Sequence, residues 1–200
     1  MTRRSIGTDG IGKAILVGAK GAFKDYRKMS GGHWLDAAPE SYIQSSIANE
    51  ISRMQFHGKG VYVTLEASTK RILEDCNLKI DKRRVKMRER QRFDILVWSE
   101  DYYPRAVIEI KKCWHQSQCI SDIKRIRQWL KGDNPLLEVG YIVAYSSAKG
   151  KNAQDTLTSR FKKIAEAADA IWAPSEDYEM DDEGWTWGVA CISMFPSAKA

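Results

Sequence analysis

The sequence predicts an α/β fold in which a mixed sheet is flanked by helices. Two observations favour this class. Helix-forming patterns stand before and after a central group of strands, and 43% of the 200 residues are hydrophobic, which is enough for a substantial core. A chain of this length forms one domain or a slightly enlarged one. We expect a domain over residues 34–200, preceded by a basic, glycine-rich extension over residues 1–33 with a short helix at 12–28.

The extension superficially resembles a phosphate-binding loop, but we do not expect it to bind ATP. In the segment GTDGIGKA, Ala14 replaces the hydroxyl that would bind magnesium, and no apolar strand precedes Gly7.

The elements of the domain follow from apolar spacing and from start and stop signals. Ile43, Ile47 and Ile51 recur at helical spacing after Pro39, which suits a first turn. Short apolar runs bounded by polar turns indicate strands. In chain order, we expect a helix at 34–56, a strand at 61–67, a short helix at 68–76, strands at 92–98 and 105–112, a helix at 121–132, a strand at 140–147, a helix at 152–171 and a strand at 185–195.

The composition favours a cytoplasmic protein without a membrane partner. No apolar run approaches the ~18 to 20 residues needed to cross a bilayer. The N-terminal apolar piece AILVGA is too short for a signal peptide. Four scattered cysteines do not form a disulfide framework, which indicates a reducing, intracellular setting.

Charge is concentrated in two segments. Residues 79–92 contain eight Lys and Arg against two acids, and residues 176–183 contain six acids. A basic cluster of this kind is often a solvated surface. It predicts phosphate binding only if it lies beside a site.

The sequences RFDILVW (92–98) and RAVIEIKK (105–112) place charges inside two expected core strands. A hairpin symmetric about the polar turn pairs positions that sum to 203, so Asp94 would face Glu109 at a Cβ separation of roughly 5 Å. Two opposed carboxylates destabilise each other unless a cation neutralises them. Mg²⁺ is the natural cation, because it prefers oxygen ligands. Lys111 points to the same side as Glu109 and can stabilise developing negative charge.

A purely structural interpretation of these charges is also open. Edge strands carry charged residues that prevent aggregation, and a Glu-x-Lys sequence occurs by chance. The symmetric register and the adjacent basic segment favour a functional site.

Asp94 followed by IEIK resembles the PD-(D/E)xK nuclease superfamily, and the resemblance extends over residues 34–146. It implies a restriction-endonuclease-like αβββαβ core and metal-dependent hydrolysis of DNA phosphodiester bonds, with release of the 3′ oxygen. Asp94, Glu109 and the Ile110 carbonyl would bind Mg²⁺ or Mn²⁺. Lys111 would orient or activate water, or neutralise the phosphate. The sequence departs from the family pattern at Phe93, where the eponymous proline would stand.

Many members of the superfamily add an acid from the first helix, and Glu40 and Glu50 are the two candidates here. At 100° per residue, Glu40 lies inside the apolar stripe and Glu50 lies on its margin. The sequence from Glu40 to Gln44 also resembles the E-x-x-x-Q helix of some members. We favour Glu40, although an acid near a helix N-terminus is also favourable by itself.

Basic residues in two segments are the expected contacts to the DNA backbone. The alternative for the helical set is a solvated face. The candidates are Arg83, Arg84 and Arg88 in the basic segment and Lys124, Arg125, Arg127 and Lys131 on the helix at 121–132.

Cysteine and tryptophan residues are expected to be structural. The spacing of Cys113, His115 and Cys119 matches no strong zinc or iron–sulfur pattern, so we expect buried thiols and a surface histidine. The seven tryptophans, Trp185 and Trp187 included, are expected in the core.

Two other functions remain open. The chain could be a catalytically inactive nucleic-acid-binding or assembly module of the same fold, or an unrelated α/β protein whose basic surface binds a partner protein. Retention of the Asp, Glu and Lys favours the nuclease. The substrate structure, the sequence specificity, the number of metal ions and the oligomeric state, a homo-oligomer included, stay open.

Overall fold

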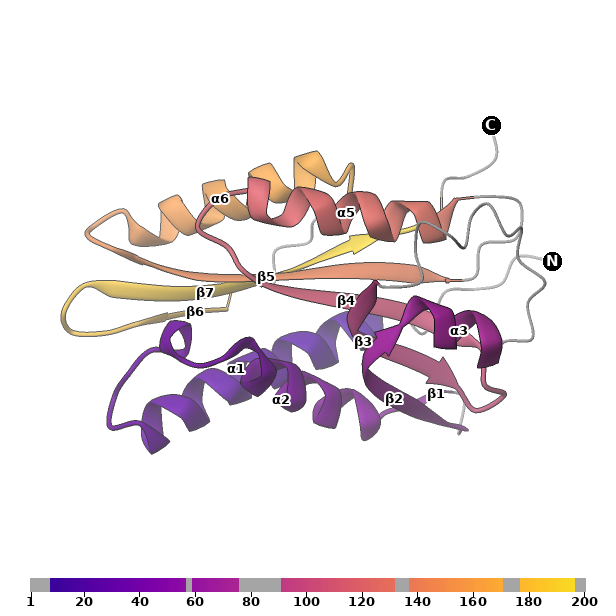
Figure 1. Cartoon of the computed structure of the whole chain (residues 1–200). Coiled ribbons are helices and arrows are strands. Elements are labelled where there is room, and N and C mark those ends of the chain that lie inside the picture. The colour runs from indigo at the N-terminus through magenta and orange to yellow at the C-terminus, as the bar shows by residue number, and fades with distance from the viewer. Residues whose placement is uncertain (1–7, 57–58, 76–90, 132–136, 171–176, 197–200) are drawn as a thin grey trace.

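A computed structural model describes residues 8–56, 59–75, 91–131, 137–170 and 177–196 (Figure 1). The helices in this part of the chain are α1 (Thr8–Met29), the 3₁₀ turn η1 (Leu35–Ala37), α2 (Glu40–Ser52), α3 (Thr69–Asp75), α5 (Ser117–Leu130) and α6 (Ala153–Ala167). The strands are β1 (Gln55–Phe56), β2 (Lys59–Ser68), β3 (Arg92–Ser99), β4 (Pro104–Lys112), β5 (Val139–Lys149), β6 (Asp177–Met180) and β7 (Trp185–Met194).

The described strands form one mixed sheet in the order β1-β2-β3-β4-β5-β7-β6. Strands β4 and β5 are parallel, and the other neighbouring pairs are antiparallel. Helix α5 connects the parallel pair, as a crossover between parallel strands requires. The predicted α/β class with a mixed sheet flanked by helices is therefore confirmed.

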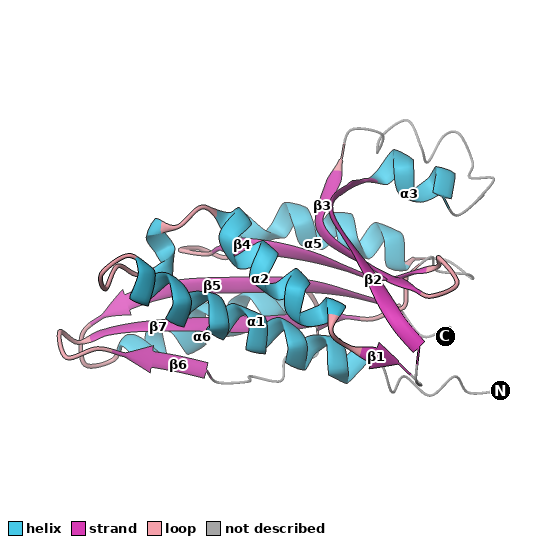
Figure 2. Cartoon of the chain, turned by 90° about the horizontal axis from the view of Figure 1, so that it is seen from below, coloured by secondary structure: helices cyan, strands magenta, loops and turns pink. Residues whose placement is uncertain are grey.

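The helices cover both faces of the sheet. Helices α1 and α2 lie on one face, and α5 and α6 lie on the other (Figures 1 and 2). Each face has its own cluster of buried apolar side chains, one containing Ile15, Ile47 and Ile95 and the other containing Ile126, Phe161 and Leu96. Ile95 and Leu96 belong to opposite clusters because successive side chains of a strand point to opposite faces.

The segment expected to be an N-terminal extension belongs to the core. Helix α1 is 22 residues long rather than the short helix predicted at 12–28. Its residues Ile11, Ile15 and Phe23 are buried in the cluster on the α1–α2 face, and the Phe23 ring stacks on Trp187 at 4.5 Å. The predicted boundary at residue 33 therefore does not separate two packing units, because the sheet needs the apolar face of α1 as cover.

The register of the β3–β4 hairpin is the predicted one over its regular part. Ile95 pairs with Ile108, Leu96 with Val107 and Val97 with Ala106, so each pair sums to 203. The register shifts only toward the turn, between Val97 and Trp98. The next positions outward from the Ile95–Ile108 pair are Asp94 and Glu109.

Element boundaries differ from the predictions at several points. The helix expected over 34–56 is divided into η1 and α2, and the one expected at 121–132 begins earlier, at Ser117. Strand β6 forms within the acidic segment 176–183, where no strand was predicted, and pairs with β7. In the described residues, no helix is long and apolar enough to cross a membrane.

Candidate active site

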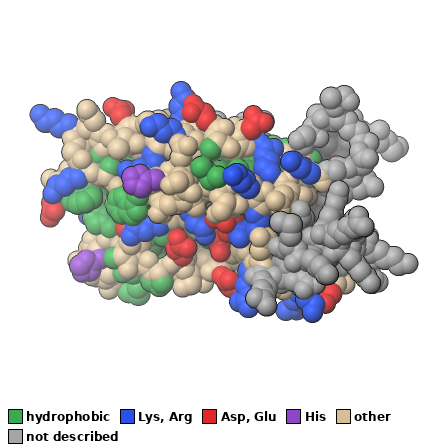
Figure 3. Space-filling model, turned by 45° about the horizontal axis from the view of Figure 1, so that its top comes forward, with side chains coloured by type: hydrophobic (Ala, Val, Ile, Leu, Met, Phe, Trp, Pro, Cys, Tyr) green, Lys and Arg blue, Asp and Glu red, His purple; other side chains and the backbone are tan. Residues whose placement is uncertain are grey.

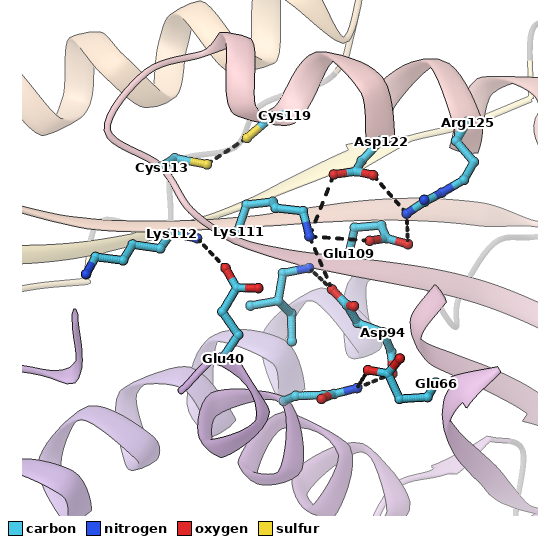
Figure 4. A network of polar contacts seen from close by, with 12 residues as sticks. Glu40, Glu66, Asp94, Glu109, Lys111, Lys112, Cys113, Cys119, Asp122 and Arg125 are labelled. Carbon is cyan, nitrogen blue, oxygen red and sulfur yellow. Dashed lines mark hydrogen bonds and ion pairs between the residues drawn. The ribbon is translucent and has the colours of Figure 1, made fainter. Parts of the chain in front are cut away.

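The ammonium group of Lys111 lies among three carboxylates (Figure 4). Its Nζ is 3.9 Å from Asp94 Oδ2, 3.8 Å from Glu109 Oε2 and 3.7 Å from Asp122 Oδ2. The three acids come from β3, β4 and α5, so the site forms where this helix covers the hairpin. Asp94 and Glu109 thus share one cation, as two neighbouring carboxylates require.

At Asp94, the regular alternation of β3 side chains between the two faces of the sheet is interrupted. Phe93 belongs to the cluster on the α5–α6 face and Ile95 to the opposite one, although two positions apart should share a face. The facing strand β2 is irregular at the same level, since Glu66 has a positive φ of 52°. Asp94 Oδ2 accepts a hydrogen bond of 2.7 Å from the Ile110 backbone N–H. This bond fixes the Asp94 carboxylate against β4.

Burial raises the pKa of Asp94, against the opposing effects of the Ile110 N–H and the Lys111 charge. The negative charges of Glu66 and Glu40 add to the increase. A carboxyl of this kind gains from a bound cation, because the cation removes the cost of holding its charge in a poorly solvated place.

Glu109 is 1% exposed and forms an ion pair with Arg125 of α5. The same guanidinium lies 2.8 Å from Asp122 Oδ1. Burial, followed by the charge of Asp94, raises the pKa of Glu109 to about 8, and Arg125 and Lys111 only partly oppose this. Additional positive charge next to the Glu109 carboxyl group would therefore favour loss of its proton.

The surroundings of Lys111 favour its charged form, whereas those of Glu109 favour the neutral form. Burial lowers its pKa, but the surrounding carboxylates, Asp94 first, raise it further, so that the pKa lies above its ordinary value. The Lys111 side chain is therefore a hydrogen-bond donor with a stable positive charge at neutral pH.

The structure brings Glu40 and Gln44 of α2 to the site. Glu40 Oε1 accepts a hydrogen bond of 3.2 Å from the Lys112 backbone N–H. Gln44 Nε2 donates to the Asp94 carbonyl at 2.6 Å and to Glu66 Oε1 at 3.1 Å. The alternative acid Glu50 instead forms an exposed ion pair with Arg53. Only Glu40 of the two candidates contacts the strand that carries Lys111.

The oxygen atoms of this site are of the types that bind a hard divalent cation. Asp94, Glu109 and the Ile110 carbonyl supply two carboxylates and a backbone oxygen, the ligands that Mg²⁺ and Mn²⁺ take. Within the part of the chain that the structure describes, no group of three or more His, Cys, Asp or Glu side chains could hold a metal ion. A cation here would have two acidic ligands, with the carbonyl and water completing its shell. It would compete with Lys111 for both carboxylates.

Sequence reasoning missed Asp122 and Glu66 and did not foresee the partner of Arg125. The Arg125 guanidinium is directed to Glu109, which weighs against its predicted contact to DNA (Figure 4). One signal was available for Asp122, which lies among the buried α5 residues Cys119, Ile123 and Ile126. An acid on such a stripe needs a partner. Glu66 gave no comparable signal.

The proposed DNA contacts on α5 differ in their surroundings. Lys124 and Lys131 are exposed. Arg127 donates to the carbonyls of Ala168 and Asp169 at the end of α6, which weighs against a phosphate contact. The candidates Arg83, Arg84 and Arg88 lie outside the described residues. On the face that α5 and α6 present, Lys and Arg side chains are interspersed with acidic ones (Figure 3).

The cysteines of the segment after β4 are buried, as predicted. Cys113 and Cys119 are both fully buried and their sulfur atoms are 2.7 Å apart, while His115 is exposed. The hydrogen bond to Cys119, together with burial, raises the pKa of the Cys113 thiol. The Cys113 thiol is therefore held in its protonated form.

Comparisons of the chain with models of protein families, with curated proteins and with solved structures find no match.

Proposed function

We propose that this protein is a metal-dependent nuclease of the PD-(D/E)xK type that hydrolyses phosphodiester bonds of DNA. The observation that carries the proposal is the common placement of Asp94 and Glu109 around the Lys111 ammonium group at the end of the β3–β4 hairpin. Two acids and a lysine with this spacing are the residue types that a cation-assisted attack on a phosphodiester needs.

The order of the elements supports the same proposal. Apart from the two-residue strand β1 and the short helix α3, the series α2, β2, β3, β4, α5, β5 follows the αβββαβ order of the restriction-endonuclease-like core, with β4 and β5 parallel. The acids lie on the two strands of the hairpin, and the helix acid Glu40 lies on the helix that precedes them. A fold alone does not imply a function, so the side chains carry most of the argument.

The proposed roles follow from the contacts of each residue. Asp94, Glu109 and the Ile110 carbonyl would hold Mg²⁺ or Mn²⁺, which when bound supplies charge neutralisation and electrophilic assistance for attack of water on the phosphorus. Lys111 donates hydrogen bonds rather than accepting a proton, since the carboxylates keep it charged. The Lys111 ammonium group would hold the attacking water or a phosphate oxygen beside those carboxylates.

Arg125 and Gln44 are positioning residues in this scheme. Arg125 holds the Glu109 carboxylate from the α5 side, and Gln44 holds the Asp94 backbone from the α2 side. The two ligands are thereby fixed from opposite faces of the sheet, and little reorganisation is needed when a cation enters.

Incubation with linear, circular, single-stranded and branched DNA in Mg²⁺, Mn²⁺ or EDTA tests the proposal. We expect cleavage in either metal and none in EDTA. Asp94→Asn and Glu109→Gln should each abolish turnover and weaken metal binding, because each removes an anionic ligand. Both replacements keep the size of the side chain, and thermal unfolding must show that both variants are folded.

The outcome also separates the alternatives. Metal binding without cleavage of any DNA would favour an inactive module of the same fold. If calorimetry detects no divalent metal binding and no DNA is cut, the nuclease proposal fails and a protein-binding role for the basic surface becomes the better hypothesis.

A further inference from the structure

A cleft of about 600 Å³ lies between helix α6 and the segment that follows β4, the strand of Glu109 and Lys111. One wall is the turn between β4 and α5, and the other is a face of α6. Its lining residues are Trp114, His115 and Gln116 from the turn, Ser117 at the start of α5, and Asp155, Thr156, Ser159, Arg160 and Lys163 from α6. The α6 residues recur at spacings of about one helical turn, so they share one face of the helix.

Trp114 is the unusual residue of this cleft. Tryptophans were expected in the core, but Trp114 is 40% exposed. Two cations lie over its indole ring, Lys112 Nζ at 5.5 Å and Arg160 Cζ at 5.8 Å from the ring centroid. An exposed aromatic ring in contact with positive charge combines the two features that hold a single-stranded nucleotide, a ring on which a base can stack and cations for the phosphate.

The turn that presents Trp114 is held in place. The backbone N–H groups of Trp114 and His115 donate to Gln118 Oε1 at 2.7 and 3.0 Å. The Cys113 N–H donates to the Tyr145 carbonyl at 2.8 Å, and Arg160 donates to the Cys113 carbonyl at 3.4 Å. Trp114 is therefore exposed on an ordered backbone, so that a base stacked on it would gain affinity without a large ordering cost.

The composition of the cleft suits a nucleotide better than an apolar ligand. Arg160 and Lys163 supply positive charge against the single acid Asp155. Hydroxyl and amide side chains (Gln116, Ser117, Thr156 and Ser159) supply hydrogen-bonding groups around them. Phosphate and sugar oxygens are recognised by such a mixture of cations and hydroxyls.

The distance to the active site fixes which nucleotide could reach the cleft. Trp114 follows Lys111 by three residues, so their Cα atoms are at most about 11 Å apart. An unpaired strand is more extended than the ~3.4 Å per nucleotide of a stacked duplex strand, so this length spans at most about three nucleotides. A strand whose phosphate is held at Lys111 can therefore place a neighbouring nucleotide against Trp114.

We propose that this cleft binds an unpaired nucleotide of the substrate strand, with its base stacked on Trp114 and its phosphate near Arg160 and Lys163. This inference rests on the proposed nuclease function and names the substrate class, DNA that is single-stranded or frayed beside the scissile phosphate. A base inside a continuous duplex is stacked on its neighbours and cannot present its face to an indole ring.

Binding measured in EDTA, where no metal-dependent cleavage proceeds, tests the inference separately from the nuclease proposal. The probes are a fluorescent single-stranded oligonucleotide and a blunt hairpin duplex, titrated with the full chain. We expect tighter binding of the single strand. Trp114→Ala should weaken that binding roughly 5- to 150-fold, the range for loss of one stacked aromatic side chain, and leave duplex binding unchanged. Trp114→Phe should retain most of the affinity.

Two matched controls define the site. Lys163→Gln should weaken single-strand binding, whereas Lys162→Gln, the exposed neighbour on α6 that does not line the cleft, should change it little. Tyr103→Ala removes an exposed aromatic side chain near the opposite end of β4 and should have no effect.

The results separate the two proposals. If DNA is cut in Mg²⁺ but Trp114→Ala binds single strands as the wild type does, the cleft inference is overturned and the nuclease stands. If Trp114→Ala loses single-strand binding while no metal supports cleavage, the cleft inference stands and the nuclease proposal fails. Equal affinity of the wild type for both probes also overturns the cleft inference.

Discussion

Arg125 reaches from α5 to form an ion pair with Glu109 on β4, and the same guanidinium contacts Asp122 one helical turn away. The Glu109 carboxyl is 1% exposed, so this pair lies inside the helix–sheet interface. Buried ion pairs are weak evidence of stability, because desolvation offsets the attraction. We infer that Arg125 is present to hold a poorly solvated acid ready for a cation.

Stability should depend on pH through Glu109. Its pKa is about 8 in the folded protein, against an ordinary value of 4.5 for an unfolded chain, so between these values the native state keeps a proton that the unfolded state has released. The free energy of unfolding contributed by this group is highest below pH 4.5. It falls by up to about 1.4 kcal/mol per pH unit as the pH rises toward 8.

Urea denaturation in EDTA at several pH values checks this dependence. Glu109→Gln imitates the protonated side chain at every pH. It should therefore become more stable than the wild type as the pH rises. A difference between the two proteins that stays constant with pH would contradict the elevated pKa of Glu109.

Lys111→Ala should abolish cleavage and leave metal binding intact or stronger. The ammonium group lies within 3.9 Å of both proposed ligands, so its removal deletes a competing positive charge. Calorimetric titration with Mn²⁺ and a cleavage assay measure the two effects separately. Lys162→Ala, which removes an exposed lysine of α6 with no proposed role, is the control. Wild-type cleavage by Lys111→Ala would show that the IEIK sequence is structural here.

Glu40→Gln should impair cleavage more than Glu50→Gln. Glu40 contacts the Lys112 backbone beside the site, whereas Glu50 pairs with Arg53 at the surface. Both are exposed or half-buried residues of the same helix, so the two variants are matched in their expected effect on stability. The comparison is made from initial cleavage rates. An inactive Glu50→Gln together with an active Glu40→Gln would show that the wrong helix acid was assigned.

Replacing Arg83, Arg84 and Arg88 by Gln should weaken DNA binding and flatten its salt dependence. Each lysine or arginine that neutralises a phosphate adds to the slope of log K against log salt. Binding measured between roughly 50 and 200 mM salt checks this. Because these residues lie outside the described part of the chain, an unchanged slope is the result that would assign them to a surface away from the substrate.

Gly18→Ala should destabilise the fold by about 1 to 3 kcal/mol, the usual cost of overpacking. A Cβ at Gly18 would lie 2.7 Å from the Ile47 Cα, so α1 and α2 could not keep their separation. Gly21→Ala in the same helix is the control. Its nearest neighbour would be Ser46 Oγ at 3.9 Å, and it should be neutral or stabilising, since alanine favours a helix. Equal thermal stability of the two variants would contradict the close approach of the helices.

The hairpin and its two acids were predictable because both depend on local rules. Strand alternation and a symmetric turn set the register that pairs Ile95 with Ile108. Helical spacing favoured Glu40 over Glu50, and the structure places Glu40 at the backbone of β4. These features require no knowledge of how distant segments pack.

The partners of the acids were not predictable in the same way. Arg125 meets Glu109 only because α5 docks on the sheet at one rotation, which its charge pattern alone did not specify. Glu66 comes near Asp94 through the irregularity where φ of Glu66 is positive. A positive φ at a glutamate leaves no signal in the sequence, whereas one at a glycine or an asparagine often does. The core position of α1 was missed because glycines within the segment suggested a loosely packed extension.

The packing of α1 on the sheet determines the smallest fragment that can fold. A fragment beginning at residue 34 would lack Ile11, Ile15 and Phe23, and would leave their partners on the sheet, Trp187 among them, facing water. An exposed apolar sheet face of this kind promotes aggregation, so we expect the fragment to aggregate and to be unsuitable for measurements on the site. Any dissection of this protein must therefore begin at or before Thr8, although every proposed site residue lies after residue 39.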